Sequence, residues 1–221
     1  MRNAIKYFVG ATYKPLVAKY LSRTKNYQYN GIKLVIPPEV FHPGFFFSTK
    51  LLLKYFDKFL LKEKTFLELG AGSGLIAISA AKKGADVTAT DINPVAVKFL
   101  KRNCEANNVD IHIILSDLFQ NIPLQHFDFI AINPPYYKKQ PNTYQDYSWY
   151  CGENGEYFHI LFDSLAAYMH SDSVVLMILC DGCDIEMIKT IADKNGFHLH
   201  LVYGKQNLLE KNFIFQIKIA E

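Results

Sequence analysis

The chain has 221 residues, of which 50% are hydrophobic and 20% are charged. This composition is typical of one globular domain with a short attachment, and it excludes a disordered, collagen-like or coiled-coil chain. No apolar run approaches the roughly 18 residues that a membrane-spanning helix needs, and Lys6 and Lys14 interrupt any secretory signal. The four cysteines are too few for a disulfide framework. We therefore expect a cytoplasmic protein with reduced thiols and no membrane contact.

The net charge of +3 hides a basic N-terminal arm, defined here as residues 1–38. This arm has no acidic residue, and its seven basic residues are Arg2, Lys6, Lys14, Lys19, Arg23, Lys25 and Lys33. The rest of the chain has 17 basic and 21 acidic residues. Aromatic residues alternate with the basic ones in the arm, a composition that suits stacking on bases and contact with phosphates. The arm is interpreted either as a nucleic-acid or ribosome contact or as an ordinary solvated surface.

Local signals set the first part of the chain apart. Pro15 begins a predicted helix over 15–23, and Asn30-Gly31 predicts a β-hairpin over 27–36. Prolines and a glycine at 37–44 mark the end of this unit. We predict a helix–hairpin extension over 1–46 and a larger domain over 47–221.

From residue 47 onward, helical and strand patterns alternate. Helices are predicted at 48–61, up to 83, at 94–107, at 155–169 and up to 195. Strands are predicted at 65–69, 86–90, 111–115 and 127–132, up to 179, at 197–203 and at 212–219. Apolar strands that alternate with helices indicate a parallel sheet covered on both faces. The last two strands lack an intervening helix and should pair antiparallel, so the predicted fold is a doubly wound, mostly parallel, seven-stranded α/β sandwich.

A glycine turn follows the first strand of this domain, at Gly70, Gly72 and Gly74. Glycines at this place allow the backbone to approach a ligand above the end of the strand. A dinucleotide-binding turn has the spacing G-x-G-x-x-G. Here the third glycine comes one residue early, and Leu75 occupies the position of the third glycine in that motif. The turn therefore predicts a ligand site other than a pyrophosphate site.

Acidic residues follow the next two strands. Asp91 ends the second strand, where a carboxylate accepts hydrogen bonds from both hydroxyls of a ribose. Asp117 follows the third strand and is interpreted either as a partner of an adenine amino group or as a solvated loop residue.

The fourth strand runs directly into Asn133-Pro134-Pro135-Tyr136. The two prolines lack N–H donors and fix their φ angles, so this turn is stiff. The Asn133 side-chain oxygen and the Pro134 carbonyl are acceptors that can face one NH2 group, and Tyr136 offers an aromatic face for a planar substrate. The tetrad predicts a site for a planar amide or an exocyclic aromatic amine.

These motifs together resemble the class I S-adenosylmethionine-dependent methyltransferases. Within that class they are similar to the branch that methylates planar NH2 nitrogens, which includes HemK-like glutamine methyltransferases of release factors and N6-adenine methyltransferases. The resemblance covers about residues 40 to 219 and implies that the larger domain is the catalytic domain. It implies Asn133, Pro134, Pro135 and Tyr136 as catalytic residues and S-adenosyl-L-methionine as the cofactor, bound by Thr49, Glu68, Gly70, Ala71, Gly72, Gly74, Asp91, Ile92, Asp117, Leu118 and Asn133.

Two further stretches resemble the HemK-like enzymes. Thr49 lies at a helix start that contacts the cofactor in that family, although Phe47 and Ser48 stand where acidic residues are usual. The segment 151–155 resembles the family's glycine-containing segment after the tetrad. In length the chain is similar to the compact archaeal and eukaryotic relatives, which act with a small activator subunit, and the resemblance implies such a partner here.

Three functions remain open from the sequence. The first is methyl transfer to a glutamine of a protein such as a release factor, and the second is methylation of adenine N6 in RNA or DNA. The third is a non-catalytic module that binds the cofactor. No metal site is expected, because the C-x-x-C pair Cys180 and Cys183 has no second ligand pair with zinc spacing nearby and is interpreted as packing.

Overall fold

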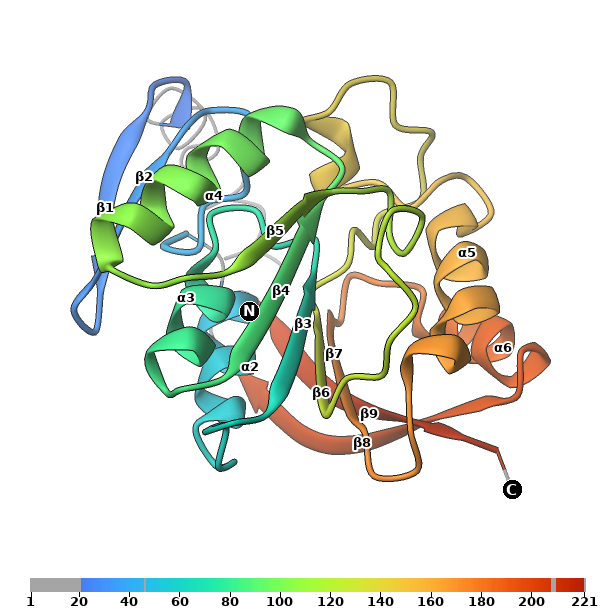
Figure 1. Ribbon diagram of the computed structural model, residues 1–221. Coiled ribbons are helices and arrows are strands. Elements are labelled where there is room, and N and C mark those ends of the chain that lie inside the picture. Colours follow the sequence, from blue (N-terminus) through green and yellow to red (C-terminus); the bar gives the residue numbers. More distant parts are fainter. Residues whose placement is uncertain (1–20, 46, 208–209, 221) are drawn as a thin grey trace.

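The computed structural model describes residues 21–45, 47–207 and 210–220, which form a seven-stranded sheet and a separate β-hairpin (Figure 1). The hairpin consists of β1 (Lys25–Tyr29) and β2 (Ile32–Ile36), and its turn residues Asn30 and Gly31 both have positive φ angles. The prediction of a hairpin around Asn30-Gly31 is therefore confirmed. Most of the predicted helix over 15–23 lies outside the described residues, as do Arg2, Lys6, Lys14 and Lys19 of the basic arm.

The elements of the larger unit alternate as predicted. The strands are β3 (Thr65–Leu69), β4 (Asp86–Asp91), β5 (His112–Leu115), β6 (Phe129–Ile132), β7 (Val174–Cys180), β8 (Phe197–Gln206) and β9 (Lys211–Ile219). The helices are α2 (Phe47–Phe56), α3 (Leu75–Lys82), α4 (Pro94–Asn107), α5 (Glu156–Leu165) and α6 (Ile185–Lys194), with short 3-10 turns at Asp146–Ser148 and Ala166–Tyr168. No helix of the described part is long and apolar enough to cross a bilayer.

The strand order is β5-β4-β3-β6-β7-β9-β8. Strands β3 to β7 are parallel, whereas β9 pairs antiparallel with both β7 and β8. This confirms the predicted doubly wound fold and its antiparallel last pair. The order reverses between β3 and β6, and at such a switch point the loops after the strands diverge and leave a crevice for a ligand.

Two hydrophobic cores cover the two faces of the sheet. One core packs α2, α3, α4 and the hairpin against one face, and the other packs α5, α6 and the segment 118–127 against the opposite face. Figure 1 shows these two layers on either side of the strands. The parallel strands are therefore buried on both sides, as their continuous apolar sequences predict.

The hairpin is attached to α4 by two asparagine side chains. Asn103 accepts a hydrogen bond from the Val35 N–H (2.8 Å) and donates to the Val35 carbonyl (3.2 Å). One turn later, Asn107 accepts from the Lys33 N–H (3.0 Å) and donates to its carbonyl (2.6 Å). Asn103 also donates to the Ser73 carbonyl in the glycine turn (3.0 Å). These amides take the place of a third strand along β2 and connect the hairpin to the glycine turn.

Some element ends differ from the predictions. The helix predicted over 48–61 ends at Phe56. Beyond it, the N–H groups of Lys58 and Phe59 donate to the carbonyls three positions earlier, and the Phe59 ring packs on Phe129. The helix predicted over 155–169 ends at Leu165 and tightens into a 3-10 turn, where the Tyr168 hydroxyl donates to the carbonyls of Phe119 and Ile122. The strand predicted over 127–132 begins only at Phe129.

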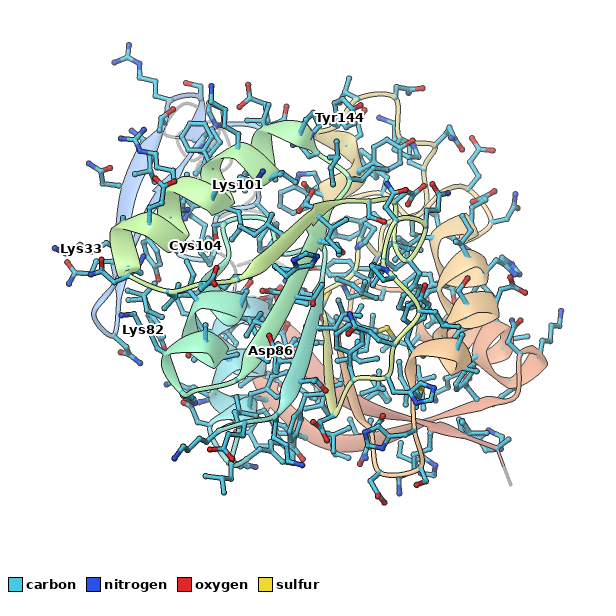
Figure 2. The ribbon with its side chains drawn as sticks, in the orientation of Figure 1. Lys33, Lys82, Asp86, Lys101, Cys104 and Tyr144 are labelled. Carbon is cyan, nitrogen blue, oxygen red and sulfur yellow. The ribbon has the colours of Figure 1, made fainter. Side chains whose placement is uncertain are left out.

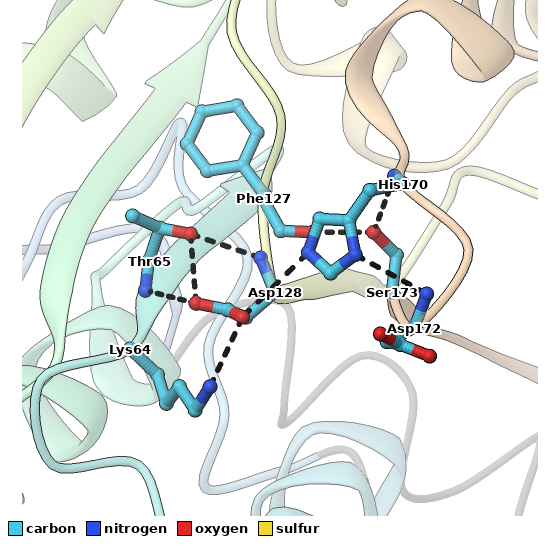
Figure 3. A network of polar contacts seen from close by, with 7 residues as sticks. All are labelled: Lys64, Thr65, Phe127, Asp128, His170, Asp172 and Ser173. Carbon is cyan, nitrogen blue, oxygen red and sulfur yellow. Dashed lines mark hydrogen bonds and ion pairs between the residues drawn. The ribbon is translucent and has the colours of Figure 1, made fainter.

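Asp128 joins the amino ends of three strands (Figure 3). Its carboxylate accepts from the Thr65 N–H (2.9 Å) and hydroxyl (3.1 Å) and pairs with Lys64 (3.2 Å), while His170 lies 3.6 Å away. Partial burial raises the pKa of Asp128, but the hydrogen bonds from Thr65 and Lys64 outweigh it and hold the pKa below its ordinary value. This network fixes the end of the sheet opposite to the glycine turn.

Candidate cofactor and acceptor site

A cavity opens at the carboxyl ends of β3, β4, β5 and β6. Counted together with the open solvent at its mouth, the space between the lining residues is about 1020 Å³. In Figure 2, Tyr144, which lines the cavity, lies near the top of the molecule, and Asp86, the first residue of β4, lies well below it. The sequence-predicted residues that line the cavity are Thr49, Glu68, Gly70, Ala71, Gly72, Asp91, Ile92, Asp117, Leu118, Asn133, Pro134, Pro135 and Tyr136.

The glycine turn supplies the floor of this cavity. Gly70 has a φ of 70°, and a methyl group placed on it meets no atom within 4 Å, so its Cα faces open space. Gly72 has a φ of 53°, and its N–H donates to the Asp91 carboxylate (2.8 Å). Gly74 does not line the cavity, because it precedes α3 and a side chain there would lie 2.1 Å from Leu100. The first two glycines thus face the ligand site, and the third allows α3 to pack against α4.

Asp91 lies at the end of β4 and supports the turn. One carboxylate oxygen accepts from the Gly72 N–H, and the other accepts from the Asn93 N–H (2.9 Å). Each oxygen keeps a further lone pair, so the carboxylate can still accept the two hydroxyls of a ribose. Burial raises the pKa of Asp91 although both backbone hydrogen bonds lower it.

Glu68 is a buried carboxyl beneath the same turn. It accepts from the Ala77 N–H in the first turn of α3 (2.7 Å), so it orients this helix toward the cavity. Burial raises the pKa of Glu68 to about 8. The hydrogen bond from Ala77 lowers the pKa, whereas the negative charge of Asp91 raises it further. A cationic ligand in the cavity would favour the ionised form of this group.

Asp117, Leu118 and Tyr157 form the wall next to β5. Asp117 is half-buried, and burial raises its pKa. Leu118 is buried with a φ of 46°, a conformation held by the hydrogen bond from the Ser116 hydroxyl to its carbonyl (2.9 Å). Tyr157 reaches this wall from α5, and burial raises its pKa, with Asp117 and Asp91 adding to the shift. The phenol therefore lies in the electrostatic field of both predicted cofactor-binding acids.

The Asn133 amide has one free oxygen and one occupied nitrogen. Its Nδ2 donates to the Thr49 hydroxyl (3.2 Å), which fixes the amide plane. Its Oδ1 is buried and has no hydrogen-bond partner among the described residues. Thr49 therefore contacts the tetrad directly, and both Thr49 and Asn133 line the cavity.

Tyr136 is buried, with 8% of its surface exposed, and its ring contacts that of Tyr137 at 5.1 Å between centroids. Burial raises the pKa of its hydroxyl far above the ordinary range, so the phenol stays protonated. The N–H groups of Tyr136 and Tyr137 both donate to the Trp149 carbonyl (3.2 and 2.9 Å). These bonds bring the aromatic loop, residues 144–150, back onto the tetrad.

The aromatic loop both lines the cavity and packs on the body of the protein. Tyr144 and Tyr147 line the mouth of the cavity. Trp149 packs against Phe41 with their ring centroids 5.2 Å apart, and Gln145 donates to the Pro38 carbonyl (3.3 Å). The segment after the hairpin therefore holds the loop beside the tetrad.

Sequence reasoning missed several lining residues. Phe41 and Pro43 come from the segment after β2, and Tyr157 comes from α5. The proline-rich composition of 37–44 indicated only a boundary, and Tyr157 lies within a helical pattern that indicates packing. None of the three carries a sequence signal that separates a lining residue from a core residue.

The fold and the cavity together define a protein of the Rossmann-like class with a ligand site at the carboxyl ends of its strands. The residues fit S-adenosylmethionine on two observations. The open space at Gly70 and the acids at the ends of β4 and β5 suit its adenosine part. Glu68 is a buried carboxyl that lines the same cavity, where it suits the positive charge of the methyl donor.

Comparison with known proteins agrees with this assignment. Residues 31–148 match the family described as "Methyltransferase small domain". A Methanocaldococcus jannaschii protein, whose name proposes protein N5-glutamine methyltransferase activity, is 39% identical over 67% of this chain and 76% of its own length. The ribosomal protein L11 methyltransferase of Thermosipho africanus is 42% identical over 45% of this chain, but the match spans only 38% of that relative.

Solved structures share the fold at low sequence identity. The T. thermophilus 16S rRNA N2 G1207 methyltransferase, in complex with AdoMet and guanosine, has a TM-score of 0.65 at 18% identity and covers 88% of this chain and 50% of that one. The E. cuniculi Mtq2–Trm112 complex, which is responsible for the methylation of the eRF1 translation termination factor, has a TM-score of 0.63 at 17% identity, and the match covers 82% of this chain and 99% of that one. The chain belongs to the methyltransferase small domain family and is an S-adenosylmethionine-dependent methyltransferase.

Proposed function

We propose that this methyltransferase acts on a planar NH2 nitrogen and that its acceptor is the side-chain amide of a protein glutamine. The observation that carries the proposal is the Asn133 side chain, which belongs to a residue that lines the cavity and whose buried Oδ1 has no donor among the described residues. A buried acceptor without a partner costs about 1–3 kcal/mol. An NH2 group of the substrate would supply the missing donor, which is why Asn133 suits such an acceptor.

The chemistry follows from the weakness of the nucleophile. S-adenosylmethionine supplies a methyl group that its sulfonium already activates. An amide nitrogen is a poor nucleophile because its lone pair is delocalised, and hydrogen bonds from NH2 to Asn133 Oδ1 and to the Pro134 carbonyl draw electron density onto it. These bonds strengthen as positive charge develops on nitrogen, so they stabilise the transition state more than the ground state. The proton becomes acidic after transfer, and no dedicated base is needed.

Thr49 and Tyr136 complete the acceptor site, which we define as Thr49, Asn133, Pro134 and Tyr136. Thr49 holds the plane of the Asn133 amide, because its hydroxyl accepts the hydrogen bond from Nδ2. Tyr136 limits the site from the side of β7 and offers an aromatic surface to a planar group. Orientation of this kind contributes to rate by aligning the nitrogen with the methyl group.

A translation release factor is the proposed protein substrate. The support is the relative from M. jannaschii, whose name proposes protein N5-glutamine methylation, and the fold shared with the Mtq2–Trm112 complex. We extend the proposal to a small activator subunit, since that solved neighbour is itself a two-protein complex.

Adenine N6 in RNA or DNA is the second candidate acceptor. Phe41, Tyr136, Tyr144 and Tyr147 all line the cavity, and aromatic rings are suited to stacking a base. The basic arm over 1–38 adds charge for phosphate contacts. A paired base would first have to leave the duplex, at a cost of a few kcal/mol.

The test is transfer of labelled methyl from S-adenosylmethionine into an extract from cells that lack this protein. If protease releases the label and nuclease does not, the result supports the glutamine acceptor. Mass spectrometry of the labelled band then identifies the residue. Nuclease-sensitive label would replace it with the adenine acceptor. Asn133→Ala should abolish most of the transfer while S-adenosylhomocysteine binding, measured by calorimetry, stays close to that of the unmodified protein. Equal loss of transfer and of binding would contradict the role of Asn133.

A further inference from the structure

A second cavity adjoins the cavity that contains the acceptor site. Its lining comes from the residues around the start of β1, the segment after β2 and the aromatic loop. None of the residues predicted for catalysis or for the cofactor lines it. Phe41 and Ser148 line both cavities, so the two spaces meet at these residues. A substrate that reaches the acceptor site can therefore extend directly into the second cavity.

Apolar residues make up much of the wall of the second cavity. Ile36 ends β2 and Val40 follows it, and both are buried. The Trp149 ring packs against Phe41 with an angle of 53° between the two ring planes. A tilted pair of this kind does not offer the flat platform on which bases stack. The wall therefore suits the aliphatic carbons of a polypeptide better than the rings of a nucleic acid.

The second cavity has an excess of positive charge. Among the described residues of its lining, the charged ones are Arg23, Lys25 and Glu39. Both cations belong to the basic arm, which has no acidic residue. Burial lowers the pKa of His42 in the same lining, and the positive charges of Lys50 and Lys25 lower it further. The imidazole therefore stays neutral at pH 7, and the cations beside an apolar wall favour a ligand with a carboxylate.

Trp149 connects the second cavity to the acceptor site. It lines the second cavity, and its carbonyl accepts hydrogen bonds from the N–H groups of Tyr136 and Tyr137 (3.2 and 2.9 Å). Gln145 of the same loop donates to the Pro38 carbonyl (3.3 Å), and both of these residues line the second cavity. A ligand in the second cavity would therefore fix the loop that supports Tyr136.

We propose that the second cavity is a substrate subsite, which binds the protein segment beside the methylated glutamine and selects a carboxylate side chain in that segment. The inference rests on the proposed function, because the glutamine in the acceptor site determines which part of the substrate extends into the second cavity. Arg23 and Lys25 pair with the carboxylate, and the apolar wall covers the neighbouring carbons. Because an extended chain advances about 3.3–3.6 Å per residue, we place the carboxylate within about five positions of the glutamine.

The experiment uses Trp149, which is the single tryptophan of the chain, so its fluorescence reports on the second cavity in the unmodified protein. The probes are capped nine-residue peptides with a central glutamine, in which alanine alternates with glutamate, serine or lysine at the other positions. Each peptide is titrated into the full chain in the presence of S-adenosylhomocysteine. The glutamate peptide should change the Trp149 emission at an about fivefold lower concentration than the serine peptide, and the lysine peptide should bind most weakly.

Two charge reversals form a matched pair. Arg23→Glu should reverse the preference, so that the lysine peptide binds more tightly than the glutamate peptide. Arg102→Glu makes the same change of charge on the exposed face of α4, outside the lining of the second cavity, and should keep the original preference. Both side chains are exposed, so urea unfolding of the two variants should match that of the unmodified protein.

Methyl transfer from S-adenosylmethionine to the same peptides gives a second readout. The KM of the glutamate peptide should be about fivefold lower than that of the serine peptide at a similar kcat, because the subsite binds the ground state and the transition state alike. Arg23→Glu should remove this difference, whereas Arg102→Glu should keep it.

Equal responses of the Trp149 emission to the glutamate and serine peptides, or equal effects of Arg23→Glu and Arg102→Glu, would overturn the proposal. A nine-nucleotide RNA of adenosines is the competing probe. If only this RNA changes the Trp149 emission and Arg23→Glu weakens its binding, the second cavity binds a phosphate backbone and the polypeptide assignment is wrong. If the glutamate peptide binds through Arg23 but the label in the cell extract is nuclease-sensitive, the carboxylate-selective cavity stands and the glutamine acceptor of the proposed function fails.

Discussion

Asn103 of α4 makes with Val35 of β2 the pair of hydrogen bonds that a neighbouring strand would make. Its Oδ1 accepts from the Val35 N–H at 2.8 Å, and its Nδ2 donates to the Val35 carbonyl at 3.2 Å. The side chain is fully buried, so these bonds are shielded from water. An edge strand usually leaves such groups unpaired, and here a helix satisfies them.

Replacing Asn103 with alanine should therefore destabilise the whole protein. The change removes three buried hydrogen bonds, to Val35 twice and to Ser73, and we expect a loss of about 2–4 kcal/mol in the free energy of unfolding. Urea unfolding measures it, with Lys101→Ala on the exposed face of the same helix as the control. If Asn103→Ala lowers the free energy of unfolding no more than Lys101→Ala does, water must replace the hydrogen bonds of the Asn103 amide.

Substitutions at Thr49 distinguish between two roles of this residue, which are holding the Asn133 amide and binding the cofactor. Thr49→Val keeps the shape but removes the hydroxyl that accepts from Asn133, so turnover should fall by about tenfold. Thr49→Ser keeps the hydroxyl and should restore most of the turnover. Binding of S-adenosylhomocysteine should change by less than about twofold in both variants. If Thr49→Val weakens that binding as much as it lowers turnover, Thr49 holds the cofactor, as the family resemblance implies, and does not orient Asn133.

Glu68 should make the stability of the cofactor-free protein depend on pH. Its pKa is raised from an ordinary value of 4.5 to about 8, so the folded state keeps a proton that the unfolded state has lost across this window. The stabilising contribution is complete below pH 4.5 and is lost as the pH rises toward 8. Urea unfolding at pH 5, 6.5 and 8 should show a steeper decline for the unmodified protein than for Glu68→Gln. If the stability of both proteins declined equally, Glu68 would be ionised in the folded protein over the whole pH range.

Asp128 should contribute stability from the opposite end of the sheet. Asp128→Ala removes the acceptor of Thr65 and Lys64, and we expect a loss of about 1–3 kcal/mol at neutral pH. Because its folded pKa is lowered, this contribution is present above the unfolded pKa and is lost as the pH falls through the folded value. The deficit should thus shrink in acid. Asp172→Ala is the matched control, since only its backbone N–H bonds to His170. A deficit that is the same at pH 3 and pH 7 would rule out the carboxylate as its source.

Elements with a strong local signal were predictable from the sequence. The strand Thr65–Leu69 and the helix Pro94–Asn107 have the predicted bounds, the latter because Asn93 caps the helix by accepting from the Val95 N–H at 2.9 Å. The hairpin follows from Asn30-Gly31, whose positive φ angles suit its tight turn. In each case the residues that decide the structure lie within a few positions of one another.

Features that depend on distant contacts were not predictable. The end of α2 depends on Phe59 packing against Phe129, 70 positions away in the sequence. Asn103 and Asn107 are polar residues of α4, a residue type that is mostly exposed in proteins, yet both are buried against β2. The motif indicated Asn133, but the orientation of its amide depends on Thr49, which is 84 residues distant. Tyr157 belongs to the cavity only because the fold brings α5 to the wall that Asp117 also lines.

The hydrogen bonds of Asn103 and Asn107 to β2 also limit where residues can be inserted into the chain. Ile32, Leu34 and Ile36 face the core while Lys33 faces solvent, so one inserted residue would exchange these faces along the strand. It would also move the Val35 and Lys33 backbone groups out of reach of two amides held at a fixed spacing by α4. The exposed segment 123–126 has no such double constraint, and insertions there should be absorbed by the loop. Length variation among functional variants of this enzyme should therefore be excluded from the hairpin and concentrated in that loop.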